Sequence, residues 1–312
     1  MQVVRSIRRF SGLAGGCALT IGNFDGLHLG HQAIIETLGE RARALGVPTA
    51  LMTFEPMPRA LFTPDDPPLR LSSLREKMED ARALGVDYFV RARFDRAFAA
   101  LSPDEFLNDL IVQRLNARAI LVGEDFRFGH RRSGDINTLR QFSADRGIEI
   151  IPLPDVRLDD QRVSSTRVRD ALTDGDPAAA ARLLGRPYRV SATVVRGQQL
   201  GRTLGFPTAN LRLHRPAALR YGVYAVWVRL PDGSYKAGAA SFGVRPTVDG
   251  KEPLLEVFLL DFDGDLYGQR LDVFFAGFVR DEEHYESLDV LITQMHIDVA
   301  DVRAQLLEQD HP

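Results

Sequence analysis

The sequence predicts two domains: an α/β domain with a parallel sheet, followed by an antiparallel β-barrel that ends in a helix. From Cys17 to about Gly185, short apolar runs alternate with segments of helical periodicity, which is typical of a parallel sheet. From Arg186 onward, β-rich segments are separated by turns. A chain of 312 residues, 45% of them hydrophobic, is long and apolar enough for two cores. We therefore expect domains over residues 1–184 and 185–312.

The first domain begins with a short apolar run over residues 18–21. Helices are predicted where apolar residues recur at helical spacing, and glycines follow several of them as stop signals. Parallel strands end at one sheet edge, where ligands bind. Both GNFDGLHLGH (22–31) and GEDFRFG (123–129) directly follow a strand, so both loops should lie at that edge. The predicted strands are 18–21, 48–54, 87–94, 118–123 and 148–154, and the predicted helices are 31–46, 71–85, one after Ser102, and 137–147.

The second domain follows a segment with strong capping signals, VSSTRVRDALTDGD (163–176). Its hydroxyl residues are N-cap candidates for a short helix over 167–172, and Asp176-Pro177 starts another. Exposed arginines beside a helix start indicate either an anion site or a capped surface helix. The β-rich segments that follow are 188–197, 222–230, 231–243, 254–262 and 266–279, and a helix is expected from Ser287 to about Glu308.

Composition favours small-molecule partners. The net charge is −3 and no basic face is visible, so we expect neither nucleic acid nor a membrane surface as a partner. A single cysteine, Cys17, fits a reducing cytoplasm. The segment Ser6-Ile7-Arg8-Arg9-Phe10 resembles a weak twin-arginine export signal, but glycines break the apolar run behind it, so we expect a cytoplasmic protein. Nothing in the sequence predicts the oligomeric state.

The turn over residues 22–31 predicts a phosphate site. A strand that leads into a helix leaves unpaired N–H groups at the helix start, and the glycines at 22, 26 and 30 allow close approach of a ligand. His28 and His31 are three residues apart and share one face if the helix begins that early. They fit three interpretations: a metal site, structural histidines, or donors of hydrogen bonds to a reacting phosphate.

Several motifs in order resemble one family. GNFDGLHLGH resembles the HxGH signature of the nucleotidylyltransferase superfamily, and SSTRVR stands where that superfamily has its second phosphate-binding signature. Together with FEPMP, FDRAFAALSPDEFL, GEDFRFG and GRTLGFPTANL, they resemble the bacterial bifunctional riboflavin kinases/FMN adenylyltransferases over nearly the whole chain. The resemblance implies a Rossmann-like nucleotidylyltransferase domain and a riboflavin kinase barrel. It implies that riboflavin and ATP give FMN in the barrel, and that FMN and ATP give FAD in the first domain, both with Mg²⁺.

The same resemblance implies site residues in the first domain. His28 and His31 would stabilise the α-phosphate of ATP as the FMN phosphate attacks it. Flavin needs a flat apolar surface, for which Phe62 and Phe128 are favoured over Phe126, although anchoring of loops in a core is the alternative. The nucleotide would contact Gly22, Asn23, Phe24, Asp25, Asp125, Arg162, Ser164, Ser165, Thr166 and Arg169, of which the serines, Thr166 and Arg169 would hold the β- and γ-phosphates.

The second domain carries a glycine-rich turn that is not a Walker loop, because none of the three lysines in the chain completes that motif. Thr208 and Asn210 alternate along a predicted strand, so both face the same way and could ligate Mg²⁺ beside ATP. The resemblance extends nucleotide binding in the barrel to Gly197, Gly201, Arg202, Gly205, Pro207, Thr208 and Asn210.

Glu256 lies in an apolar strand, where it shares a face with Leu254 and Phe258. A carboxylate there is costly unless it is paired or functional, so a salt bridge to an arginine is the alternative to a catalytic role. The resemblance implies that Glu256 is the general base that deprotonates riboflavin. Arg280 and Glu282 would contact the flavin or hold a flap. Ser241 and Val244 depart from the family pattern and receive no role.

Three alternatives to a two-step enzyme remain at this stage. A chain that kept only one activity would have lost one of the two signatures. A flavin-responsive binding protein would need the pockets without Glu256 or the two histidines. A nucleic-acid-binding barrel would need a basic, aromatic strand face.

Overall fold

A computed structural model describes residues 1–10, 12–197, 201, 204–213, 217–247, 250–307 and 309–312, and leaves out the side chains of 245–247 and 250–252. The chain divides into two compact units. The first comprises Met1–Pro68 and Ser72–Val163, and the second comprises Leu69–Leu71 and Ser164–Pro312. No helix within the described ranges has both the length and the apolarity needed to cross a membrane.

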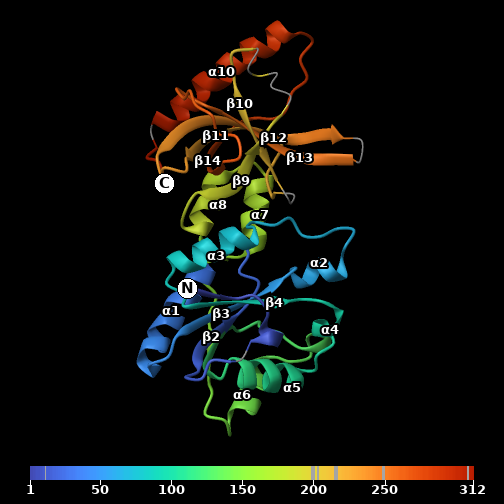
Figure 1. The fold of residues 1–312 in the computed structure, drawn as a ribbon, viewed down its shortest axis with the longest axis vertical. Helices are drawn as coiled ribbons and strands as arrows, with labels where there is room; N and C mark the ends of the chain where they lie inside the picture. Colours follow the sequence, from blue (N-terminus) through green and yellow to red (C-terminus); the bar gives the residue numbers. More distant parts are fainter. Residues whose placement is uncertain (11, 198–200, 202–203, 214–216, 248–249, 308) are drawn as a thin grey trace. The chain divides into compact units, whose positions relative to one another are not determined.

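The first unit is built on a sheet of six parallel strands (Figure 1). Their order is β1-β4-β3-β2-β5-β6. From β2, the chain adds β3 and β4 on one side of the sheet, and then β5 and β6 on the other side. The chain order therefore reverses between β2 and β5, which is the place where open parallel sheets bind ligands. The strands are β1 (Gln2–Val4), β2 (Cys17–Ile21), β3 (Thr49–Glu55), β4 (Tyr88–Arg93), β5 (Ala117–Gly123) and β6 (Glu149–Leu153).

Helices cover both faces of this sheet. Alternate strand residues such as Leu51 and Phe89 pack with α1 (Leu29–Leu45) and α3 (Leu74–Ala83). Their neighbours Met52 and Val90 pack with the π-helix η2 (Phe106–Arg114) and with α6 (Ile136–Ser143). Strands buried on both faces are expected to be mostly apolar, and β2 (CALTI), at the centre of the sheet, is buried at all of its residues. Shorter elements are η1 (Ile7–Arg9), α2 (Pro58–Phe62), α4 (Arg96–Ala99), α5 (Pro103–Glu105), η3 (His130–Arg132), β7 (Arg157–Leu158) and β8 (Gln161–Arg162).

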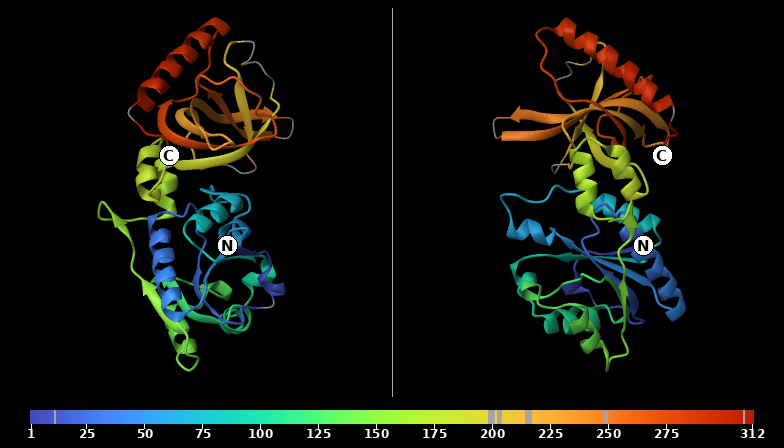
Figure 2. Two further views of the ribbon diagram at one scale, coloured as in Figure 1. Left: turned by 60° about the vertical axis from the view of Figure 1, so that its left-hand side comes forward. Right: turned by 180° about the vertical axis from the view of Figure 1, so that it is seen from behind.

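The second unit is a closed antiparallel barrel with helices against it (Figures 1 and 2). The barrel order is β10-β13-β12-β11-β14-β9, and closure leaves no free sheet edge among these strands. Helix α10 (Leu288–Leu307) packs Val302 and Leu306 against the outside of the barrel. The strands are β9 (Tyr188–Val195), β10 (Thr208–Arg212), β11 (Gly222–Arg229), β12 (Tyr235–Thr247), β13 (Gly250–Leu259) and β14 (Arg270–Arg280).

Two helices precede the barrel in this unit, α7 (Ser165–Thr173) and α8 (Pro177–Leu184). Ser164, one of the three predicted N-cap candidates, is the N-cap of α7, which begins two residues earlier than expected. Its Oγ accepts a hydrogen bond of 3.3 Å from the Arg167 N–H. The backbone N–H of Arg220 donates to the Leu172 carbonyl at 3.0 Å, which ties the end of α7 to the chain segment before β11. The compact units divide after Val163, and the domain boundary at residue 184 stays a prediction.

Candidate active sites

The loop after β2 lies at the point where the strand order reverses, and it carries both histidines. Helix α1 begins at Leu29 with His28 as its N-cap, so the helix starts early enough for the predicted shared face. The imidazole rings of His28 and His31 stack with their centroids 3.7 Å apart and their planes 20° apart. Only 6% of His28 is exposed. The two rings therefore form one unit at a helix start, where backbone N–H groups favour an anion.

Gly30 makes room for this arrangement. A Cβ atom at Gly30 would lie 3.2 Å from both Cε1 and Nδ1 of the His28 ring. That separation is tighter than ordinary van der Waals contact, so any larger residue would push the His28 ring away. The glycine in the HLGH sequence therefore lets the His28 ring keep its position.

Asn23 and Asp25 fix the backbone of the same loop. Asp25 is 1% exposed, and its Oδ1 accepts hydrogen bonds from the Ser72 N–H at 3.1 Å and the Ser72 hydroxyl at 3.3 Å. The Asn23 carbonyl accepts the Thr53 hydroxyl at 3.0 Å. Phe24 is 1% exposed and belongs to the core, and the N–H of Gly22 extends the sheet by donating to the Met52 carbonyl at 3.1 Å.

Asp125 and Arg162 contact one another. Arg162 Nη1 donates to Asp125 Oδ2 at 2.8 Å, and its Nε lies 3.0 Å from Asp155. The hydrogen bond from Arg162 holds the pKa of Asp125 below its usual value, and the same bond raises the pKa of Arg162. Both side chains are about half exposed or more, at 65% and 47%. Asp125 is thus an ionised hydrogen-bond acceptor that is paired with the guanidinium of Arg162.

The two favoured aromatic side chains have different surroundings. Phe62 on α2 is 66% exposed and meets Phe94 edge-on at 6.1 Å. Phe128 is 6% exposed, with ring contacts to Phe106 at 5.4 Å and Phe126 at 5.6 Å. Only the Phe62 ring offers a free face of any size, whereas Phe128 lies in the core, as the loop-anchoring alternative describes.

The first turn of α7 presents hydroxyl groups and an arginine. Ser164 and Ser165 are partly buried and Thr166 is exposed. Arg169 Nε donates to the Leu69 carbonyl at 2.6 Å, so the guanidinium is oriented by the backbone of the second unit. These are the donor types that hold phosphate groups.

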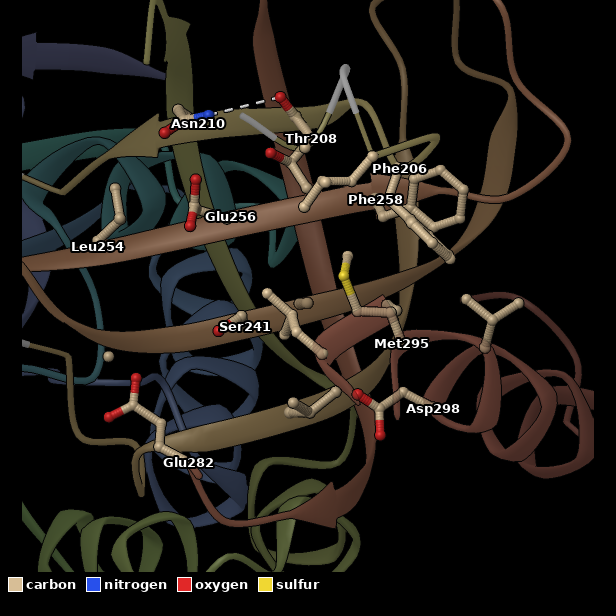
Figure 3. A pocket seen from close by; sticks show the side chains of 18 of the residues that line it. Phe206, Thr208, Asn210, Ser241, Leu254, Glu256, Phe258, Glu282, Met295 and Asp298 are labelled. Carbon is tan, nitrogen blue, oxygen red and sulfur yellow. Dashed lines mark hydrogen bonds between the residues drawn. The ribbon is translucent and has the colours of Figure 1, made fainter. Parts of the chain in front are cut away.

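A cavity of about 470 Å³ lies in the second unit, lined by barrel strands and by helix α10, and contains the second set of predicted residues (Figure 3). Thr208 and Asn210 of β10 and Glu256 of β13 all line it, as strand alternation predicts. In the sheet register Glu256 lies between Asn210 and Ser241 on the neighbouring strands. Residues Leu255 and Val257 of β13 point the other way and are fully buried. The Glu256 carboxylate therefore projects into a cavity whose opposite strand face is core.

The polar and the aromatic side chains of the cavity gather on different sides. Figure 3 shows Asn210, Glu256 and Ser241 on one side, with Leu254 beside Glu256, while Phe206, Phe258 and Met295 lie on the other, with Thr208 and Asp298 near them. The Phe206 and Phe258 rings meet at 5.2 Å. Such a division suits a ligand with a flat aromatic part and a hydroxyl-bearing chain.

Thr208 and Asn210 also line a second cavity, of about 430 Å³. Gly197, Pro207 and Tyr267 are among its other lining residues. A Cβ atom at Gly197 would lie 2.4 Å from Asn210 Oδ1, so glycine is needed there for the amide to keep its position. Gly201 lines the first cavity, Gly205 is exposed, and Arg202 lies outside the described residues. Sequence reasoning missed Tyr267, because a single tyrosine after a turn carries no motif.

Arg280 and Glu282 line the first cavity too. Arg280 donates from Nε and Nη2 to the two carboxylate oxygens of Asp298, both at 2.7 Å, which raises the pKa of the guanidinium. Asp298 is 5% exposed, and its Oδ1 also accepts from Gln294 at 3.0 Å. Sequence reasoning missed Asp298, since one acidic residue in a helix is usually a solvated one. The carboxylate of Glu282 lies against Gly243, and a Cβ atom at position 243 would overlap that carboxylate.

Two family models match the chain, one per predicted activity. The FAD synthetase model matches residues 12–167, and the riboflavin kinase model matches residues 184–306. A bifunctional riboflavin kinase/FMN adenylyltransferase of Haemophilus influenzae is 42% identical over 97% of this chain and 99% of its own length. The chain belongs to the bifunctional riboflavin kinase/FMN adenylyltransferase family. It therefore catalyses the phosphorylation of riboflavin to FMN and the adenylylation of FMN to FAD.

Two further proteins match nearly the whole chain. The bifunctional riboflavin kinase/FMN adenylyltransferase of Pseudomonas fluorescens is 45% identical over the whole of both chains. A solved structure from Streptococcus pneumoniae, described as a macrolide-efflux protein, is 31% identical, with a TM-score of 0.84 over 96% of this chain and 98% of that chain. Both activities therefore follow from the curated full-length relatives, and the alternatives of a sensor without turnover and of a single-activity enzyme fall away.

Proposed function

We propose that the loop after β2 and the first turn of α7 supply the groups that hold ATP during adenylyl transfer. His28 and His31 donate hydrogen bonds to the α-phosphate as an oxygen of the FMN phosphate attacks it and pyrophosphate leaves. Ser164 and Arg169, with their hydroxyl and guanidinium neighbours, hold the departing phosphates. The observation that supports the histidine role is their stacking, 3.7 Å apart, at a helix N-terminus where the strand order reverses.

The remaining predicted residues of the first unit take supporting roles in this proposal. Asn23 and Asp25 shape the nucleotide loop, and the exposed ring of Phe62 stacks on the flavin. Asp125 accepts a hydrogen bond from the nucleotide while Arg162 keeps it ionised. Phe128 serves the site indirectly, because its buried ring holds the loop that carries Asp125.

In the barrel, we propose that riboflavin occupies the larger cavity and the nucleotide occupies the smaller one. The observation that supports this proposal is that Thr208 and Asn210 line both cavities. Asn210 is the register partner of Glu256, so the two substrates can meet beside the Glu256 carboxylate. The flavin ring lies toward Phe206 and Phe258, and the ribityl hydroxyl lies at Glu256. Glu256 accepts the hydroxyl proton as the oxygen attacks the γ-phosphorus and ADP leaves. Arg280 and Glu282, which line the same cavity, contact the bound flavin.

The residues present at this junction fit a magnesium ion. Mg²⁺ prefers hard oxygen ligands and keeps part of its shell for phosphates and water. Thr208 Oγ1 and the Asn210 amide oxygen are of that kind, and they face the cavity together. Among the described residues no group of three or more His, Cys, Asp or Glu side chains could hold a metal. Mg²⁺ bound by Thr208, Asn210 and ATP would neutralise phosphate charge during transfer.

We also propose where the activities divide and where the protein works. The adenylyltransferase would span residues 1–184 and the kinase residues 185–312, with α7 and α8 serving the first activity although they pack with the barrel. The single cysteine, Cys17, is fully buried, and burial raises its pKa to about 12. An unreactive thiol and an ATP-dependent reaction both fit the cytoplasm.

The reaction sequence is tested by incubating the purified protein with riboflavin, ATP and Mg²⁺ and following the flavins over time by chromatography. We expect FMN to appear first and FAD to follow, because the product of the kinase is the substrate of the adenylyltransferase. Formation of FMN alone would contradict the role proposed for the histidine loop.

The contact between Arg280 and Asp298 gives a prediction for flavin binding. Asp298→Asn removes the charge that holds Arg280 in place, so we expect the KM for riboflavin to rise about tenfold with little change in kcat. The check is steady-state kinase kinetics with riboflavin varied at saturating ATP. A fall in kcat at unchanged KM would show that the ion pair serves catalysis instead of binding.

A further inference from the structure

The loop Gly22–His28 has a backbone that does not hold its shape by itself. Phe24 and Leu27 adopt left-handed conformations, with φ of 47° and 44°, and Gly26 adopts one with φ of 83°. Left-handed backbone is unfavourable for residues that have a Cβ atom. Such a conformation persists only where surrounding contacts determine it. The loop that carries His28 therefore depends on residues outside itself.

One of those residues is a buried lysine. Lys77, on α3, is 0% exposed, and its Nζ donates to the Asn23 carbonyl at 2.6 Å and lies 3.4 Å from the Thr53 hydroxyl. Thr53, also 0% exposed, donates to the same carbonyl at 3.0 Å. Two buried donors thus converge on the peptide that immediately precedes Phe24.

A lysine is a costly choice for a site with no solvent exposure. Burying an ammonium group is much less favourable than burying an apolar side chain of similar volume, and replacement of buried charges by apolar residues is often neutral or stabilising. A core position alone would be filled as well by methionine or leucine. The ammonium group at this place therefore indicates a task for the hydrogen bond to Asn23.

We propose that Lys77 is a positioning residue for adenylyl transfer. By holding the Asn23 carbonyl, together with Thr53, it sets the path of the loop and hence the position of His28 and of the backbone N–H groups before α1. Small displacements of groups that contact a reacting phosphate carry large kinetic costs. The inference rests on the role proposed above for His28 and His31, and it adds a residue that lies outside every motif in the sequence.

The test is Lys77→Met in the full-length enzyme, with both activities measured on the same preparation. We expect kcat/KM for ATP in FMN adenylylation to fall about 10- to 100-fold, while riboflavin phosphorylation is unchanged because the kinase residues lie in the other unit. The matched control is Leu38→Ala, which opens a cavity in the core of the first unit without touching the loop. The inference requires that Lys77→Met lowers kcat/KM for FMN adenylylation more than Leu38→Ala does, when the two variants are compared at the same fraction of folded protein.

Thr53→Val provides a second variant, which removes the other donor to the same carbonyl. We expect a smaller loss in the same activity, and the double variant should lose less than the product of the two single effects, because both donors act on one peptide. An adenylylation rate in Thr53→Val equal to that of the unmodified enzyme, or a loss in Lys77→Met no larger than in Leu38→Ala, would overturn the inference.

The inference and the proposed histidine role fail in different ways. If His28→Ala and His31→Ala keep adenylylation, the role of the loop itself is wrong, whatever Lys77 does. If those variants are inactive while Lys77→Met and Thr53→Val match the controls, only the positioning role of Lys77 is wrong.

Discussion

Replacing Glu256 by glutamine is expected to lower kcat for riboflavin phosphorylation by about 100- to 10,000-fold, the usual cost of losing a general base. Glutamine keeps the size and the hydrogen-bonding reach of the side chain but accepts no proton at neutral pH. The carboxylate lies between Asn210 and Ser241 in the sheet register and lines the cavity shared with Thr208, so few other groups could replace it. Adenylylation of added FMN should continue unchanged.

The matched control for this variant is Glu282→Gln, the same substitution at another carboxylate of the same cavity. Because Glu282 is proposed to contact the flavin and not the reacting hydroxyl, its loss should raise the KM for riboflavin more than it lowers kcat. Initial rates of FMN formation, measured across riboflavin concentrations, separate the two cases. Equal kcat losses in both variants would argue that Glu256 contributes charge and not base catalysis.

Local patterns in the sequence predicted much of this site. The alternation in LLEVFLLDF was enough to place Glu256 with Leu254 and Phe258, because a strand has a strict period of two. The capping signals predicted a helix start among Ser164, Ser165 and Thr166, and Ser164 is the N-cap of α7. The glycine-rich turn predicted a helix from residue 31, and α1 begins two residues earlier, at Leu29. In each case the chemistry depends on residues within one turn or one strand.

Contacts between distant segments could not be predicted in this way. The helix that carries Lys77 was expected, but its lysine had no neighbour in the sequence to suggest contact with Asn23, 54 residues away. The ion pair of Arg280 with Asp298 likewise joins a strand to a helix. Strand β1, only three residues long, was missed because so short a run has no measurable period, although it pairs with β4.

Sequence patterns also do not show whether an aromatic residue is buried or exposed. Phe62 and Phe128 both stand in loops of the sequence, and both received the same stacking prediction. Burial separates them, since 66% of Phe62 but only 6% of Phe128 is exposed. An aromatic residue carries the same signal in a pocket and in a core, and only its packing against Phe106 and Gly134 distinguishes the second case.

Replacing either His28 or His31 by alanine is expected to lower kcat for FMN adenylylation by about 100- to 1000-fold, the usual cost of removing a preorganised donor to a developing charge. Because the two rings stack at 3.7 Å, they act as one unit, and the double variant should lose less than the product of the single losses. The measurement is the initial rate of FAD formation from FMN and ATP, with riboflavin phosphorylation as the internal control.

His130→Ala is the matched control, since this exposed histidine lies in the same unit but not in the loop. It should leave both activities unchanged. The alternative in which the stacked histidines bind a metal is tested by measuring the metal content of the purified protein. That alternative requires a bound metal in the unmodified enzyme and its loss in His28→Ala. Retention of FAD formation by the double variant would show that the helix N-terminus alone stabilises the α-phosphate, and that the two imidazoles only fill the space that Gly30 leaves.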